Sequence, residues 1–206
     1  MPGNNAQILK DDYGFDTAAA REELVRLAHA ALGGQVLDVG TGCGSMAVVL
    51  AQHGFGVTTV DFDAQAIECA KLRAQQAGKI VADRIRFVRG DALRLPFEGQ
   101  SFDAVFSFDS LHHLPDCNAA VEEMLRVLRP GGVFAAADVN DEGARAIDEV
   151  FARKDDAHFH NQCRVDVIGK ILGEMGIQYH RHRLEFVTVF IAAGPVENPA
   201  LGKPAG

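Results

Sequence analysis

Long hydrophobic runs are absent from the 206-residue sequence, and none approaches the roughly 20 residues that a membrane-spanning helix needs. Residues 1–16 also lack the basic and apolar regions of a secretory leader. The four cysteines form no CxxC pair and lie far apart, which favours reduced thiols in an intracellular compartment. We therefore expect a cytoplasmic protein that is not associated with a membrane.

Excess positive charge is absent as well. The 20 Lys and Arg residues are outnumbered by 28 Asp and Glu, which gives a formal net charge of -8. This balance does not attract nucleic-acid phosphates, and the sequence has no basic patch interleaved with aromatic residues. Because hydrophobic residues make up 48% and charged residues 23%, the composition is that of an ordinary globular domain. We expect a small-molecule partner and no nucleic acid.

The stretch VLDVGTGCGSMAVVLA, residues 36–51, combines a strand pattern, a glycine turn and a helix pattern. Gly40, Gly42 and Gly44 stand at alternate positions, so the backbone can turn sharply and a ligand can approach the main chain. The N–H groups that open the following helix would face that ligand. We interpret Cys43, inside the turn, as a small space-filling residue. The stretch predicts a site for a nucleotide-like molecule.

Strand and helix patterns alternate along most of the chain. Strands are expected over 36–39, 57–60, 85–89, 102–107, 133–138, 179–186 and 187–193, and helices over 17–32, 45–51, 63–76, 144–153 and 166–175, with another that ends at 128. This order predicts a Rossmann-like, doubly wound, mostly parallel seven-stranded sheet with an antiparallel edge hairpin and helices on both faces.

We expect a single domain over residues 1–194. An N-terminal arm and helix occupy 1–34, the ligand-binding core 35–139, and a lid segment with the edge strands 140–194. A flexible tail rich in proline and glycine follows over 195–206.

Two aspartates end successive predicted strands. Asp61 lies about 20 residues beyond the glycine turn, where an acidic residue can accept hydrogen bonds from both ribose hydroxyls. Asp91 ends the next strand, and the carboxyl ends of parallel strands meet at one edge of a sheet. Each aspartate alone could equally cap a helix or stand in a solvated turn. Their repetition at strand ends favours a ligand-binding role.

Four motifs in order, VLDVGTGCG, VDFD, GDALRLPFEGQSFDAVFSFDSLHHLPD and VLRPGG, resemble class I S-adenosylmethionine-dependent methyltransferases. The resemblance is to the small-molecule type that includes the quinone-biosynthesis C-methyltransferases, and it covers roughly half of the chain. A nicotinamide dehydrogenase is disfavoured because Ser45 stands where a dinucleotide fingerprint has its third glycine. In addition, Asp38 precedes the first glycine by two positions, as in the methyltransferase pattern.

The resemblance implies S-adenosylmethionine as cofactor and S-adenosylhomocysteine as product. Its methionine portion would be held by the turn, through Gly40, Thr41, Gly42 and Gly44. Asp38 would lie near the charged amino group, and the carbonyl of Ser107 would accept from it.

The adenosine portion would contact a second set of residues. Asp61 would bind the ribose and Phe62 would pack on the adenine. Asp91 would accept from the adenine amino group, while the N–H of Ala92 would reach a ring nitrogen.

Methyl transfer from a sulfonium is an in-line displacement, so orientation and exclusion of water supply much of the rate and a base is optional. If the acceptor must lose a proton, a histidine would suit. His112 and His113 follow the fourth strand, although they could equally shape the loop, since their motif recurs across unrelated substrates. His158 and His160 lie in the lid segment, with a surface role as the alternative. The histidine spacings match no recognised zinc site, so no metal is expected.

The leading interpretation is an enzyme that transfers a methyl group to a small molecule. The alternatives are a cofactor-binding regulatory or interaction protein without methyl transfer, or an RNA or protein methyltransferase. The sequence leaves the acceptor and the oligomeric state open, a homodimer included.

Overall fold

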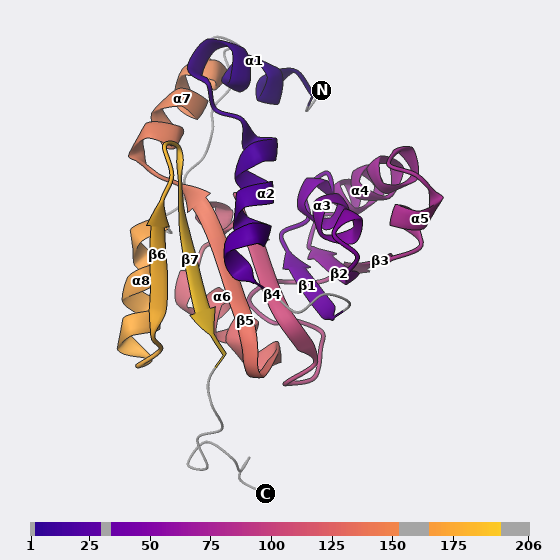
Figure 1. Cartoon of the computed structure of the whole chain (residues 1–206), viewed down its shortest axis with the longest axis vertical. Coiled ribbons are helices and arrows are strands. Elements are labelled where there is room, and N and C mark those ends of the chain that lie inside the picture. Colours follow the sequence, from indigo (N-terminus) through magenta and orange to yellow (C-terminus); the bar gives the residue numbers. More distant parts are fainter. Residues whose placement is uncertain (1–2, 30–33, 153–164, 195–206) are drawn as a thin grey trace, which may run out of the picture.

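The computed structural model of the chain describes residues 3–29, 34–152 and 165–194. A seven-stranded sheet in the order β3-β2-β1-β4-β5-β7-β6 forms its centre (Figure 1). The strands are β1 (Gln35–Val39), β2 (Gly56–Asp61), β3 (Ile85–Arg89), β4 (Phe102–Phe108), β5 (Leu128–Val139), β6 (Tyr179–Arg183) and β7 (Val187–Ala193). The helices are α1 (Gly3–Tyr13), α2 (Thr17–Ala28), α3 (Ser45–Gln52), α4 (Ala64–Gln76), α5 (Lys79–Ala82), α6 (Cys117–Val127), α7 (Asp141–Ala152) and α8 (Val165–Glu174), with a 3-10 helix η1 (Leu111–His113).

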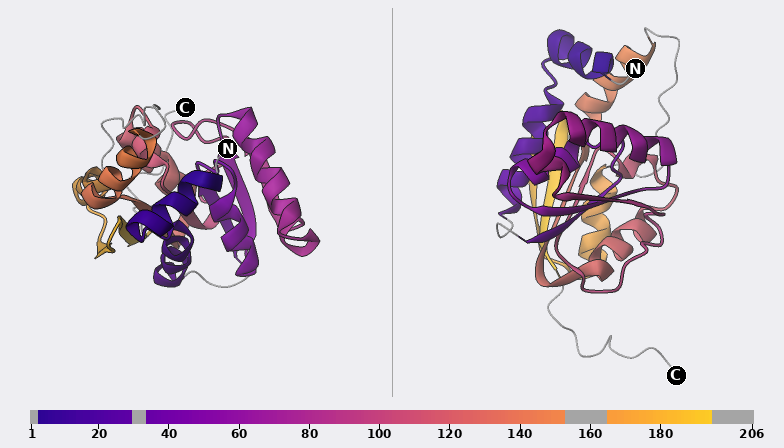
Figure 2. Two further views of the ribbon diagram at one scale, coloured as in Figure 1. Left: turned by 90° about the horizontal axis from the view of Figure 1, so that it is seen from above. Right: turned by 90° about the vertical axis from the view of Figure 1, so that its right-hand side faces the viewer.

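Strands β1 to β5 pair in parallel, whereas β7 runs antiparallel to both β5 and β6. Helices cover both faces of the sheet (Figure 2). Side chains that alternate along a strand enter opposite layers: Val36 joins the core beneath α2 and α3, and Leu37 joins the core beneath α6 and α8. The predicted doubly wound fold with an antiparallel edge hairpin is confirmed.

The N-terminal arm is helical where the sequence predicted none. Helix α1 packs against α7 at one end of the molecule (Figure 1). Leu9 is buried there, and the Tyr13 hydroxyl donates a hydrogen bond to Glu149 at 2.8 Å. The prediction failed because this helix is stabilised by a surface more than 130 residues away in the chain, which its own polar composition does not reveal.

Several element boundaries also differ from the prediction. Helix α2 is capped by Asp16, and it ends at Ala28, earlier than expected, because His29 adopts a left-handed conformation with φ 47°. Strand β5 begins at Leu128, earlier than expected, since that residue already pairs with Phe102 of β4. The short helix α5 was not predicted. The tail over 195–206 lies outside the described residues.

The prediction of reduced thiols is wrong. Cys43 in the glycine turn and Cys69 on α4 form a disulfide with 4.9 Å between their Cα atoms, and no described cysteine is free. The pairing arises because α4 packs directly on the turn: a Cβ added at Gly44 would lie 2.8 Å from the Cβ of Ala70. Cys43 is therefore a cross-link and not a space-filling residue.

Within the described ranges, no helix has both the length and the apolar character that crossing a bilayer requires.

Candidate functional site

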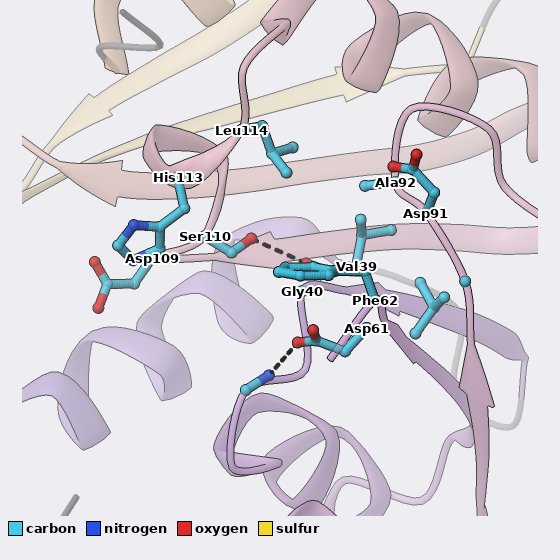
Figure 3. A pocket seen from close by; sticks show the side chains of 13 residues that line it. Val39, Gly40, Asp61, Phe62, Asp91, Ala92, Asp109, Ser110, His113 and Leu114 are labelled. Atoms are coloured by element: carbon cyan, nitrogen blue, oxygen red, sulfur yellow. Dashed lines mark hydrogen bonds between the residues drawn. The ribbon is translucent and has the colours of Figure 1, made fainter. Parts of the chain in front are cut away.

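A pocket of about 220 Å³ opens at the carboxyl ends of β1 and β2 and under the segment that follows β4 (Figure 3). It gathers residues from four separate stretches of the chain. Seven of the predicted site residues line it: Gly40, Gly42, Asp61, Phe62, Asp91, Ala92 and His113. The predicted convergence of strand ends therefore produces one cavity.

The glycine turn forms the floor of this pocket. Gly40, Gly42 and Gly44 have φ angles of 82°, 48° and 78°, in the left-handed region where only glycine is unstrained. A Cβ at Gly40 would also lie 2.4 Å from the hydroxyl of Ser110. At Gly42 nothing lies within 4 Å of an added Cβ, so this part of the turn faces open space. The turn is thus closely packed on one side and accessible on the other.

Asp61 is held in place by two backbone N–H groups. Its Oδ2 accepts from Gly42 at 2.9 Å and its Oδ1 from Asp63 at 3.0 Å. Each carboxylate oxygen has further acceptor capacity for a ligand. Beside it, the Phe62 ring is 71% exposed and points into the pocket (Figure 3). A large aromatic ring with no protein cover is suited to stacking on a planar ligand.

Asp91 and Ala92 approach the pocket from the end of β3. The Asp91 Oδ1 accepts from the N–H of Leu93 at 2.9 Å, which fixes the turn. Its side chain is otherwise exposed to the cavity edge (Figure 3). An acceptor and a neighbouring backbone donor are thus presented side by side.

Asp38 lies beneath the turn and does not line the pocket. Its side chain is fully buried, and its Oδ2 accepts from the Thr59 hydroxyl at 2.7 Å. Its Oδ1 and the buried hydroxyl of Thr41 have no hydrogen-bond partner among the described residues. Burial raises the pKa of Asp38 to about 6, against the lowering effect of Thr59 and Arg21. Two predicted residues therefore carry unsatisfied polar atoms just below the site.

Asp38 should make folding stability depend on pH. Its pKa rises from the usual 3.8 to about 6, so between these values the unfolded chain is ionised there while the folded protein keeps the proton. The contribution of Asp38 to the free energy of unfolding should fall by on the order of 2 kcal/mol as pH rises through this window. Urea denaturation of the wild type and of Asp38→Asn checks this, because the titrations that the substitution leaves unchanged cancel in the difference. A difference independent of pH would contradict it.

In the segment after β4, Ser110 lines the pocket, whereas Ser107 is not among the lining residues. Ser107 is fully buried and its hydroxyl hydrogen-bonds that of Ser110 at 2.8 Å. Ser110 in turn donates to the carbonyl of Val39 at 3.1 Å and lines the cavity with Asp109 and Leu114. The sequence singled out neither Ser110 nor Leu114 as a site residue. Their only signal was their position directly after a buried strand.

The two adjacent histidines occupy different environments. His112 is buried, its Nδ1 lies 2.6 Å from Asp138 Oδ1, and its backbone N–H donates to the other oxygen at 3.0 Å. Burial lowers the pKa of His112, but the hydrogen bond and charge of Asp138, with the charge of Asp109, outweigh this and raise it. His113 is exposed and lines the pocket, with its ring centroid 3.9 Å from that of His112. His112 therefore ties the η1 turn to β5, and His113 faces the cavity.

Asp109, His112 and Asp138 bring potential metal-ligating atoms within 4.8 Å of one another. The Asp138 carboxylate already accepts from the His112 ring, the His112 backbone and the Val139 N–H. Asp138 and His112 therefore form a hydrogen-bonded carboxylate–histidine pair. The predicted His158 and His160 lie outside the described residues.

Arg21 is a candidate that the sequence did not reveal. It projects from α2 with its guanidinium carbon 4.7 Å from the centroid of the Phe108 ring, and its Nη1 donates to the carbonyl of Thr17 at 2.9 Å. Burial lowers its pKa, opposed by the charges of Asp109 and Asp38. A cation is therefore held near Asp109, one of the residues that line the pocket.

A doubly wound sheet with a glycine turn and acidic residues at successive strand ends is typical of Rossmann-like domains that bind a nucleotide cofactor. Comparison with known families narrows this class. Residues 37–136 match a family described as "Methyltransferase domain". This stretch, just under half of the chain, is therefore similar to methyltransferase domains.

Individual relatives agree with this assignment. The demethylmenaquinone methyltransferase of Roseiflexus castenholzii is 40% identical over 141 residues, which cover 66% of this chain and 53% of that protein. A solved structure of a putative S-adenosyl-L-methionine-dependent methyltransferase from Methanococcus maripaludis superposes with a TM-score of 0.71 at 21% identity, covering 95% and 93% of the two chains. The [4+2]-cyclase SpnF has the same fold, with a TM-score of 0.71, 18% identity and coverage of 87% and 81%. The chain spans only 33% to 50% of the length of the first curated relatives that it matches.

Proposed function

We propose that this protein binds S-adenosylmethionine in the pocket between the glycine turn and Phe62 and transfers its methyl group to a small-molecule acceptor. The observation that carries the proposal is the arrangement of Asp61, fixed by Gly42 and still able to accept, next to the uncovered Phe62 ring. The curated relatives named as methyltransferases support it.

The residues present fit this cofactor. Asp61 would accept from the two ribose hydroxyls, and Phe62 would stack on the adenine. Asp91 would accept from the adenine amino group while the N–H of Ala92 donates to the ring. These four residues account for the polar edges and the planar face of an adenosine.

The methionine portion has an equally specific match. The open side of Gly42 gives it room, and the unsatisfied Oδ1 of Asp38 supplies a negative charge beneath the turn for its ammonium group. The methionine portion would be held between Thr41, Gly40 and the backbone of the turn. Ser107 would contribute its carbonyl, as the family pattern implies.

When bound, the cofactor supplies a methyl group on a cationic sulfur, which makes the transfer a displacement that needs alignment more than acid–base help. The chain's own part is to orient the acceptor and keep water out. Where the acceptor must lose a proton, His113 is the histidine that faces the cavity and would take it. His112 would hold the η1 turn in place through its hydrogen bond with Asp138.

Calorimetric titration with S-adenosylmethionine and S-adenosylhomocysteine tests the cofactor assignment, and absence of binding at millimolar concentration would overturn it. Methyl transfer is tested by following S-adenosylhomocysteine release with a panel of phenols, quinones, amines and thiols. Binding without turnover on any acceptor would favour the second candidate, a cofactor-binding protein without methyl transfer. The fold shared with SpnF, a [4+2]-cyclase, supports keeping that candidate, since the fold alone does not dictate methyl transfer.

Arg21→Met should weaken S-adenosylhomocysteine binding about 10-fold, because a charge-assisted hydrogen bond to the carboxylate of the amino-acid portion is worth about 1.5 kcal/mol. Binding of 5′-methylthioadenosine, which lacks that portion, should be unchanged. Arg26→Met on the exposed side of the same helix, where Arg26 pairs with Glu23, is the matched control. Equal loss for both ligands would show that Arg21 acts on the fold of the pocket and not on the carboxylate.

A further inference from the structure

The Cys43–Cys69 disulfide joins the two segments on which cofactor binding is proposed to depend. Cys43 stands between Gly42 and Gly44 in the turn, and Cys69 lies on α4, the helix that follows Asp61 and Phe62. The cross-link therefore closes a ring of chain that contains β2 and two of the four residues proposed to contact the adenosine, Asp61 and Phe62. No other described disulfide touches the pocket.

Three attachments hold the turn against α4. The disulfide is one, the close approach of Gly44 to Ala70 is the second, and a hydrogen bond from Arg73 Nε to the carbonyl of Cys43 at 2.7 Å is the third. Of the three, only the disulfide is covalent, and only the disulfide can be broken by reduction and re-formed by oxidation. Its loss would leave the turn attached to α4 by one hydrogen bond and by packing.

The disulfide is also open to exchange. Both cysteines are half-buried, and neither belongs to the buried core. Cys43 lies just ahead of the N-terminus of α3, and Arg73 lies beside it, and both favour a thiolate at this position. Because a stabilised thiolate is a better leaving group, attack on Cys69 with departure of the Cys43 thiolate is the favoured course.

We propose that Cys43–Cys69 is a thiol–disulfide exchange site that sets the affinity for the cofactor, which rests on the proposed function. A dithiol reductant gives up two electrons and two protons and becomes a disulfide. The Cys43–Cys69 bond breaks, and each sulfur ends as a thiol. The oxidised turn is already ordered for the ligand, whereas the reduced turn must be ordered on binding and therefore binds more weakly.

The first test compares one protein in two redox states. Peptide mapping without reductant should recover the fragment that joins residues 43 and 69, and its absence would overturn the proposal. The dissociation constant of S-adenosylhomocysteine, measured by calorimetry, should rise about 10-fold after treatment with dithiothreitol. Reoxidation should restore it.

The Cys43→Ser/Cys69→Ser variant is the matched control, because dithiothreitol acts on every disulfide of the chain. It should bind S-adenosylhomocysteine as weakly as the reduced wild type, and dithiothreitol should not change its affinity. Circular dichroism verifies that the variant is folded, and Cys43→Ala/Cys69→Ala replaces it if it is not.

The possible results are distinguishable. Equal affinity of the oxidised and reduced wild type, or tighter binding by the reduced form, would overturn the exchange site and leave the cofactor assignment intact. Absence of binding in both states would overturn the proposed function, and the exchange site with it. A response of the double variant to dithiothreitol equal to that of the wild type would also overturn the proposal, since the effect would then come from another disulfide.

Discussion

Asp61→Ala should weaken binding of S-adenosylhomocysteine about 100-fold, the largest effect expected of any substitution in the pocket. The carboxylate would accept from two ribose hydroxyls, and hydrogen bonds to a charged group contribute about 1.5 kcal/mol or more each. The substitution also removes the acceptor of the Gly42 N–H, so the turn loses an attachment at the point where the methionine portion would lie.

Calorimetry on three variants separates this effect from local unfolding. Asp63→Ala is the matched control, since Asp63 caps α4 by accepting from Gln65 but offers nothing to a ribose. Its affinity should stay within about 2-fold of the wild type, because a lost cap of about 1 kcal/mol acts on the helix. His112→Ala should weaken binding less than Asp61→Ala does. The reverse order would show that the ribose contact is assigned to the wrong residue.

The pocket was largely predictable because its signals are local. Parallel strands end at one edge of a sheet, so Asp61 and Asp91 had to meet once the strands were recognised from their period. Glycines at alternate positions indicated a sharp turn of the backbone. Each inference needed only a few consecutive residues and a known sheet topology.

The residues that the sequence missed depend on how closely elements pack. Arg21 lies over Phe108, next to the pocket residue Asp109, only because α2 lies across β5 and β7, and nothing near Arg21 in the sequence encodes that placement. The pairing of Cys43 with Cys69 depends on the absence of a side chain at Gly44, which lets α4 approach the turn. The packing distance between two elements cannot be predicted from the sequence of either element alone.

The two neighbouring histidines show the same limit within one motif. His112 and His113 are identical in type and adjacent in sequence, so no pattern separates them. The 3-10 turn rotates one ring toward Asp138 in the core and leaves the other in the cavity. Only the position of β5 decides which histidine can face a ligand.

Removal of the Cys43–Cys69 cross-link should lower the free energy of unfolding by about 3.5 kcal/mol. The two cysteines are 26 residues apart, and closing a loop of that length restricts the unfolded chain by about this amount. For a chain of this size, the midpoint of thermal unfolding should fall by roughly 7–14 °C. A stable domain tolerates the loss, since typical stabilities are about 5–15 kcal/mol.

Non-additivity identifies the source of that loss. Cys43→Ser and Cys69→Ser each break the same bond, so each should cost nearly the full amount, and the double variant should cost little more than either single one. Urea denaturation of all three proteins under oxidising conditions measures this. If the two single losses were small and added up in the double variant, the sulfur atoms would be stabilising the fold through side-chain packing alone. The disulfide would then be absent in solution, and the turn would depend on Arg73 and Ala70 for its attachment to α4.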